Sequence, residues 1–337
     1  MQRTDNTAAF IEAQVYSDFL IENLHDGLLP GTFYRDVTDF PSGTTLNIKV
    51  VGDATIQDVE EDKALTYNPI DTSTVTLAIT DYVGDGFYIT DVLRQDGAQI
   101  DQLLALRAQS GTRAIQENFE TKFLQTAGIT AQTASSTNAV NGFAHRWVAD
   151  SAADNSFKIG LRDFVDMKLS FDKANVPQMG RIALVDPVVE ATLNLLAANF
   201  NVDRNPMFQR LLEEGFTREH KFLFNLYGWD IWTSNRLPRL TAAETITGPS
   251  AVAETSPVGA VANVFMSIAD DQTKPIMGAW RQMPRAESER NKDRARDEFV
   301  TSARIDPGVA SLVHHVILYR VPATAGTEAA ALDRTAA

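Results

Sequence analysis

Cysteine is absent from this sequence of 337 residues. Its absence excludes disulfide bonds, thiolate metal sites and cysteine nucleophiles, so stability must come from packing and association. No run of 18 consecutive apolar residues occurs, and a membrane-spanning helix is therefore not expected. The N-terminal sequence MQRTDNTAAF has neither the apolar segment nor the cleavage site of a secretory signal. We expect a protein that is made and kept in a cytoplasm.

Positive charge is also scarce. The chain has 30 Lys and Arg residues against 44 Asp and Glu residues, which gives a formal net charge of −14. Proteins that grip nucleic acid normally carry a surplus of basic residues, because neutralising phosphates supplies most of their affinity. The acidic balance indicates that this protein, if it lies near nucleic acid, contains the nucleic acid rather than gripping it.

Sequence motifs for catalysis are missing as well. The chain has no GxxxxGKS/T phosphate loop, no GxSxG nucleophile elbow and no HExxH zinc motif. Gly84-Asp85-Gly86 lacks the third glycine of a dinucleotide-binding fingerprint. Only His314 and His315 are close in sequence, and neighbouring residues of a strand point to opposite faces. We expect no catalytic residues, no metal site and no cofactor.

The size of the chain favours one large domain or two intimately connected domains. Within residues 41–80, two arms show the alternation of apolar and polar residues that is typical of β-strands, around Leu46-Asn-Ile48 and Val75-Thr-Leu77. Each arm of about 20 residues could reach about 65 Å, whereas a compact chain of this length has a radius of gyration of about 20 Å. A hairpin of that reach needs the surface of a partner. The alternative is a hairpin that folds back as an edge of its own sheet.

A long helix is predicted from a cap at Thr90 or Asp91 to about Gln125. It would span roughly 50 Å, with Gly97 and Gly111 as places where it bends or breaks. Helices of this length are uncommon in compact enzymes and favour a scaffold element. A second amphipathic stretch, Phe10 to Leu29, predicts either a helix packed on its own body or an arm lying on a neighbouring subunit.

The rest of the chain mixes strands and helices. A helix is expected from about Ser156 to Lys173, and strands over 181–185, 229–234 and 261–268. Asp186 is a candidate helix cap, and Pro187 suits the first turn of the following helix. Such strand-cap-helix units indicate an α/β sub-domain.

The sequence predicts exposed or turn structure in three further places. Thr241 to Pro257 has the composition of a surface loop. Glu287 to Glu298 carries charges of both signs and predicts a solvated helix or loop with intrahelical ion pairs. Asp306-Pro307-Gly308 predicts a turn between strands over 299–304 and 312–321.

The order and spacing of several segments resemble the major capsid proteins of tailed bacteriophages with the Hong Kong 97-type fold, in particular those of marine short-tailed phages. The resemblance covers nearly the whole chain. The segments that carry it are Thr44 to Lys49, Val75 to Thr80, Gly86 to Asp91, Asn141 to Trp147, Val185 to Glu190 and Gly228 to Asn235 with Leu237-Pro238.

This resemblance implies an α+β capsid fold. It implies an N-terminal arm (1–40), an extended loop called the E-loop that lies over an adjacent subunit (41–82), and a peripheral P-domain with a long spine helix (83–154). An axial A-domain (155–285), return strands of the P-domain (286–321) and a C-terminal tail (322–337) would follow. Inter-subunit contacts are expected in the E-loop, from Asp58, Glu60, Glu61, Asp62, Lys63 and Tyr67.

The resemblance also implies partners. Copies of this chain would form hexamers and pentamers of an icosahedral virion shell, enclosing double-stranded DNA without sequence-specific binding and without a membrane. A separate scaffolding protein, a portal protein and a decoration protein are further expected partners. Lys63 lies in the region where some family members form a Lys–Asn cross-link, but nothing marks its partner. The alternatives are an encapsulin-like nanocompartment shell and a cytoplasmic α/β enzyme or binding protein.

Overall fold

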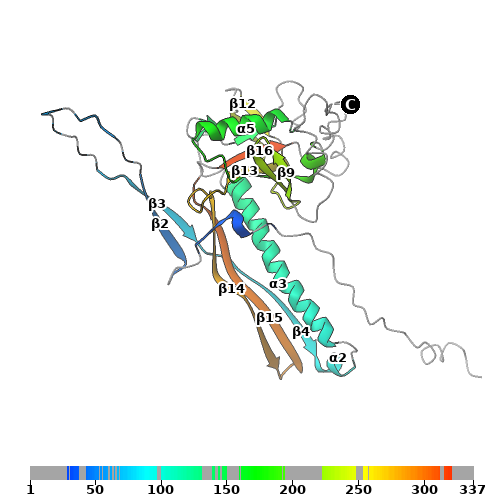
Figure 1. Cartoon of the computed structure of the whole chain (residues 1–337). Coiled ribbons are helices and arrows are strands. Elements are labelled where there is room, and N and C mark those ends of the chain that lie inside the picture. Colours follow the sequence, from blue (N-terminus) through cyan, green and yellow to red (C-terminus); the bar gives the residue numbers. More distant parts are fainter. Residues whose placement is uncertain are drawn as a thin grey trace, which may run out of the picture.

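The computed structural model has an elongated part, a rounded part and a projecting hairpin (Figure 1). It describes residues 29, 31–37, 43–52, 54, 56–59, 61–62, 64, 67, 69–96, 100–130, 139–140, 143–144, 146–149, 159, 161–191, 193, 222–247, 253–256, 258–311 and 315–320. The predicted amphipathic stretch Phe10 to Leu29 lies outside these residues except for Leu29. Helices and strands mix in both parts, as the α+β prediction expects.

The elongated part is a four-stranded sheet in the order β1-β14-β15-β4. Its long strands are β14 (Ile276–Asn291) and β15 (Arg296–Val309), flanked by β4 (Tyr82–Thr90) and the short β1 (Arg35–Asp36). Helix α3 (Ile100–Gln125) runs lengthwise along this sheet (Figure 1). Phe87 of β4 stacks on Phe299 of β15 with ring centroids 5.1 Å apart, and Arg107 of α3 lies over the Phe87 ring.

The predicted long helix is present in two pieces. Helix α2 (Asp91–Asp96) begins where expected, because the Thr90 hydroxyl accepts the Leu93 N–H at 3.4 Å, as an N-cap does. The next described helical residue is Ile100, and residues 97–99, which include the predicted bend or break at Gly97, lie outside the described part. Gly111, in contrast, stays inside α3. A β-carbon there would lie 3.0 Å from Oδ2 of Asp85, so glycine allows β4 to approach the helix closely.

The rounded part is a six-stranded sheet with both faces covered. Its order is β7 (Arg146–Val148), β16 (His315–Arg320), β13 (Val261–Ser267), β8 (Arg181–Val185), β10 (Trp229–Thr233) and β9 (Phe222–Leu226). Helix α5 (Leu161–Lys173) covers one face, where Phe171 and Phe265 pack edge-on against the buried ring of Trp229. The C-terminal end of α3 covers the other face with Phe123 and Leu124.

The strand-cap-helix prediction at Arg181 to Pro187 is confirmed. Strand β8 is fully buried, and the Asp186 carboxylate accepts the Val188 N–H at 3.3 Å at the start of the helical residues 187–191. The predicted strands at Trp229 and Val261 are confirmed as β10 and β13. Helix α5 is present, but its first described helical residue is Leu161 rather than a residue near Ser156.

Three local predictions are wrong. The charged stretch Glu287 to Glu298 is not a helix or loop but the far end of the β14–β15 hairpin, where ion pairs between neighbouring strands replace intrahelical pairs. Strand β15 runs straight through Asp306-Pro307-Gly308 without a turn. Among the described strands, β14 alone pairs with residues 306–309, and proline is tolerated at such an edge. Residues 241–257 contain a hairpin of β11 (Glu244–Thr247) and β12 (Ala253–Ser256).

Strands β15 and β16 lie in different sheets. The resemblance groups both of them, within residues 286–321, as return strands of the P-domain. Strand β15 lies beside β4 in the four-stranded sheet, whereas β16 pairs in the six-stranded sheet with β13 and with β7, which is within the expected P-domain range 83–154. The continuous apolar run of β16, Val316 to Tyr319, predicts a strand, but such a run does not identify the neighbouring strand.

Two glycines of the rounded part allow a controlled test of packing. Gly180 and Gly228 both have positive φ, at 69° and 89°. A β-carbon at Gly180 would lie 2.8 Å from the backbone of Ala269, whereas at Gly228 nothing lies within 4 Å. We expect Gly228→Ala to lower the free energy of unfolding by about 1–2 kcal/mol, because it introduces only backbone strain. Gly180→Ala should lower the free energy of unfolding by about 1–3 kcal/mol more, because its β-carbon also overpacks the site. Denaturant unfolding measures both, and equal losses would contradict the packing argument.

Candidate assembly surfaces

The projecting hairpin is fixed to the elongated part at its root. Strands β2 (Thr45–Val51) and β3 (Thr72–Ala78) pair in register from Thr45↔Ala78 to Val51↔Thr72, as the alternating pattern predicts. Leu77 and Ile79 are buried against Met277 and Ala279 of β14. A β-carbon on Gly308 would lie 2.5 Å from Cδ1 of Leu77. Leu77 can therefore pack against β15 only because position 308 has no side chain.

Polar contacts complete the root. Thr80 donates from its backbone N–H (3.2 Å) and from its hydroxyl (3.1 Å) to Oδ2 of Asp306. The next residue, Asp81, forms an ion pair with Lys122 of α3. The hairpin is therefore attached to both layers of the elongated part, the sheet and the helix.

Beyond the root, the hairpin leaves the body. We call residues 51–70 the arm; in Figure 1 the β2–β3 hairpin and the trace beyond it project away from both sheets. A two-stranded hairpin is at best marginally stable by itself in water. The Gly52 N–H donates to the Asp71 carbonyl at 2.9 Å and closes the paired region. None of the described residues between Gly52 and Asp71 belongs to a strand.

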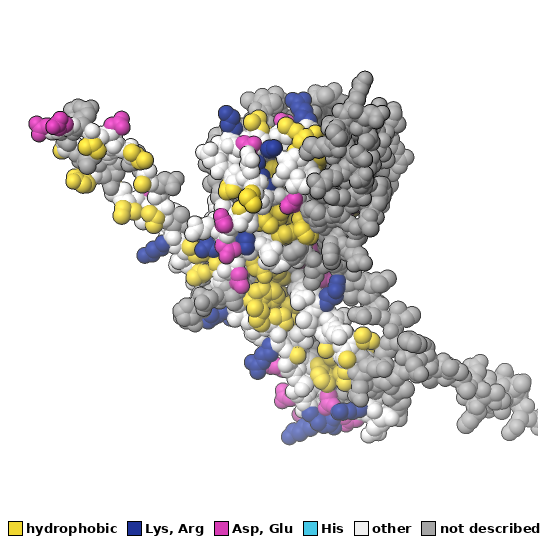
Figure 2. All heavy atoms as spheres, in the orientation of Figure 1, with side chains coloured by type: hydrophobic (Ala, Val, Ile, Leu, Met, Phe, Trp, Pro, Cys, Tyr) yellow, Lys and Arg dark blue, Asp and Glu magenta, His cyan; other side chains and the backbone are white. Residues whose placement is uncertain are grey.

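The arm exposes large apolar side chains. Ile56 is 94% exposed and Tyr67 is 91% exposed, and Val51, Val59 and Ile70 are exposed as well. Figure 2 shows hydrophobic side chains along the arm and acidic ones toward its outer end. Exposed apolar surface that is larger than scattered single residues marks a site of interaction. The arm has the character of a surface that another molecule covers.

The residues predicted for inter-subunit contact are placed on this arm where the structure describes them. Asp58, Glu61, Asp62 and Tyr67 are all exposed there, while Glu60 and Lys63 lie outside the described residues. Asp62 has a φ of 66°, which marks a turn. Ile56, Val59 and Ile70 are not among the predicted contact residues, although they are recognisable in the sequence as apolar residues within an acidic, turn-rich stretch.

A second exposed surface lies on the face of the four-stranded sheet that points away from α3. Along β4, Phe87 and Ile89 turn toward the helix, so their neighbours turn outward. Tyr82 and Tyr88 are 65% and 57% exposed on that outer face, with Gly84 and Gly86 between them. Such a face is a second candidate for a contact between proteins.

The far end of the elongated part is held by ion pairs. Arg290 of β14 contacts both oxygens of Asp91 (2.7 and 2.8 Å) and also Asp297 of β15 (3.1 Å), which in turn pairs with Arg94 of α2. The hydrogen bond from Arg290 lowers the pKa of the Asp91 carboxyl below its ordinary value. Hydrogen bonds from Arg296 and Asn291 likewise lower the pKa of Glu298. The pairs tie α2 to the β14–β15 hairpin.

Within the described residues, no three His, Asp or Glu side chains gather in a way that could hold a metal ion. No helix of the described part has the length and hydropathy to cross a membrane.

The Asp91–Arg290 pair predicts a pH-dependent attachment of α2. A carboxyl whose folded-state pKa is lowered stabilises the fold above its unfolded value of about 3.8 and loses this contribution as the pH falls through the lowered pKa. We therefore expect Arg290→Gln to reduce hydrogen-exchange protection of residues 91–96 at pH 7, and to reduce it less at a pH below 3.8, where Asp91 becomes protonated as the pH falls through its lowered pKa. Arg285→Gln is the control, because Arg285 pairs with Glu287 on its own strand. An equal effect of Arg290→Gln at both pH values would contradict the ion-pair argument.

Comparisons with known proteins agree with this geometry. The model of a family described as phage capsid protein matches residues 72–319, which is well over half of the chain. A search of curated proteins found no significant match.

Solved structures show the fold. The capsid structure of cyanophage P-SCSP1u is 15% identical with a TM-score of 0.67, and the alignment covers 93% of this chain and 94% of that one. A structure from Mycobacterium phage Che8 is 16% identical with a TM-score of 0.59 and coverages of 90% and 96%. The capsid of a native GTA particle is 14% identical with a TM-score of 0.56 and coverages of 93% and 98%. The chain therefore belongs to the phage capsid protein family and is a structural protein of the capsid shell, not an enzyme.

Proposed function

We propose that this chain is the major capsid protein of a tailed bacteriophage and that it assembles as hexamers and pentamers into an icosahedral head around double-stranded DNA. The observation that carries the proposal is the arm. Its root is buried in the elongated part, while Ile56, Val59, Tyr67 and Ile70 are held away from the body and exposed. A protein that assembles with copies of itself gives these side chains a place to be buried.

In this proposal the arm, within residues 41–82, is the E-loop and lies over an adjacent subunit. Burying a large apolar side chain is worth about 1.5–3 kcal/mol, so several such side chains in every subunit contribute a substantial part of each contact. The acidic residues Asp58, Glu61 and Asp62 would then face polar or basic groups of the neighbour. Lys63 and Glu60 remain proposed contact residues of the same loop.

The elongated part, with α3 as its spine helix, is the proposed P-domain. The rounded part with the six-stranded sheet is the proposed A-domain, whose loops meet at the shell axes. We place β7 and β16 with this A-domain, because they pair with each other and β16 pairs with β13. The proposed boundaries therefore differ from 83–154, 155–285 and 286–321, which the resemblance implies and which separate these strands from β13.

The net charge of the chain suits the proposed contents of the shell. The net charge of −14 does not favour tight binding of the packaged DNA, so DNA would be enclosed without sequence-specific contacts and released readily. The chain contains no cysteine for covalent stabilisation by disulfides. A scaffolding protein during assembly, a portal protein at one vertex and a decoration protein on the outside are the further proposed partners.

Replacing the apolar side chains of the arm tests the proposal. We expect the triple variant Ile56→Ser, Val59→Ser and Ile70→Ser to fold normally but to lower the yield of closed shells at least about tenfold. The reason is that loss of only 1.4 kcal/mol of contact energy already changes an equilibrium about tenfold. Deleting residues 53–68 should abolish stable shells and leave a soluble subunit. Negative-stain electron microscopy of the protein, expressed with and without a scaffolding protein, measures shell yield.

The control is Leu169→Ser, since Leu169 is 50% exposed but lies on helix α5 of the rounded part, away from the arm and from the loops of that part. It should assemble like the unchanged protein. Normal shells from the deletion would contradict the assignment of the arm as an inter-subunit loop. Shells that enclose protein instead of DNA would show a nanocompartment rather than a phage head.

A further inference from the structure

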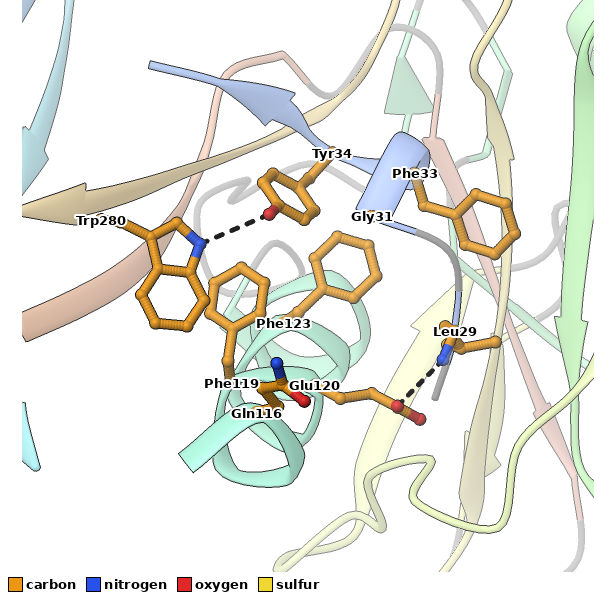
Figure 3. Close-up of a pocket in the computed structure, with 9 residues that line it drawn as sticks. All are labelled: Leu29, Gly31, Phe33, Tyr34, Gln116, Phe119, Glu120, Phe123 and Trp280. Carbon is orange, nitrogen blue, oxygen red and sulfur yellow. Dashed lines mark hydrogen bonds between the residues drawn. The ribbon is translucent and has the colours of Figure 1, made fainter. Parts of the chain in front are cut away.

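A pocket of about 220 Å³ lies between α3, β14 and the segment around the short helix η2 (Gly31–Phe33), as Figure 3 shows. The rings around it support one another. Tyr34 packs edge-on against Phe119 with centroids 5.0 Å apart, Phe119 lies 5.2 Å from Trp280, and the Trp280 indole N–H donates to the Tyr34 hydroxyl at 3.4 Å. Because each ring is fixed by its neighbours, the pocket exists before anything fills it.

The pocket has no uncompensated charge. Its one carboxylate, that of Glu120, is only 5% exposed, and both of its oxygens already have partners within the protein. One oxygen accepts the Leu29 N–H at 3.1 Å, and the other lies 3.3 Å from Nη1 of Arg236 and 3.4 Å from the Ser234 hydroxyl. A cation would have to displace Arg236 from this pair. The chemistry that fits the remaining aromatic walls is an apolar side chain.

The chain itself leads into this pocket. Leu29 lines it, and the bond from Leu29 to Glu120 fixes the backbone at its rim. The 28 residues before Leu29 include an amphipathic stretch with apolar residues near helical spacing, at Phe10, Ile11, Val15, Phe19, Leu20 and Leu24. A helix of this length is marginal in water unless its apolar face packs on something.

We propose that Leu20 and Leu24 of the same subunit fill this pocket, so that the N-terminal segment docks on α3. Leu24 is five residues from the anchored Leu29 and could lie up to about 17 Å away in an extended chain. Leu20 and Leu24 are four residues apart and share one face of a helix. A turn at Gly27 would let the segment fold back onto the pocket.

The segment of the same subunit has an advantage over that of a neighbour. A short tether holds its own segment at an effective concentration in the millimolar range near the pocket. A neighbouring copy must compete with this occupant at the much lower concentration of free subunits. The docking is therefore a property of the single subunit and is present before assembly.

Paired cysteines test the proposal, and the absence of native cysteines makes them specific. In one variant, Leu24→Cys and Gln116→Cys place one thiol on the apolar face of the segment and one at the rim of the pocket. The matched control pairs Gln116→Cys with Glu22→Cys, on the opposite face of a helix at a similar tether length. Both are treated with a short bismaleimide as unassembled subunits at micromolar concentration, after equal reactivity toward a monofunctional maleimide has been verified.

We expect an intrasubunit cross-link, seen as a monomer by electrophoresis and as a linked peptide by mass spectrometry, to form at least ten times faster for Leu24 than for Glu22. Equal rates for the two variants would overturn the proposal. Cross-linked dimers from the Leu24 variant would also overturn it, because they would show that the segment of another copy occupies the pocket. Since free subunits are measured, the result is independent of whether the arm mediates shell assembly.

Discussion

Helix α3 packs on two different sheets, and the arrangement of every other element depends on this double contact. Its C-terminal residues Phe123 and Leu124 belong to the core beneath the six-stranded sheet, while Phe119 packs near β14 in the elongated part. One face of β14 meets the helix at Gly278, where a β-carbon would lie 3.1 Å from Phe119. The neighbouring Met277 and Ala279 support the root of the arm. A continuous path of packed side chains thus joins the rounded part to the arm through one rigid helix.

Much of this fold is predictable from sequence because local patterns determine it. The period-two residues of β2 and β3, the cap at Thr90 and the buried strand before Asp186 are each visible within a few residues. The failures concern partners distant in sequence. Asp306-Pro307-Gly308 has turn chemistry, but pairing with β14 keeps it extended. The charges from Glu287 to Glu298 suit a helix surface equally well, and the ion-pair partners of Arg290 come from the adjacent strand and from α2, which are distant in the local pattern.

The candidate assembly surface was predictable in location but not in composition. A long acidic hairpin indicates an arm, and the structure places Asp58, Glu61, Asp62 and Tyr67 on it. Which apolar residues remain exposed depends on where the root ends, and that is set by Leu77 and Ile79 reaching β14. Ile48 and Ile56 are the same residue type on the same hairpin, yet Ile48 packs against the root cluster and Ile56 is exposed. Sequence alone does not distinguish them.

The alternation of apolar and acidic residues on the arm also affects the free subunit. Exposed β-prone segments with few charges associate indiscriminately, and charged gatekeeper residues between them slow this aggregation. Asp58, Glu61 and Asp62 lie among Ile56, Val59 and Tyr67, so two arms that meet by chance repel each other before their apolar side chains touch. Salt weakens this repulsion, because the screening length falls to about 3 Å at 1 M. The arm thus carries its own kinetic protection against misassembly, and ionic strength sets how strong that protection is.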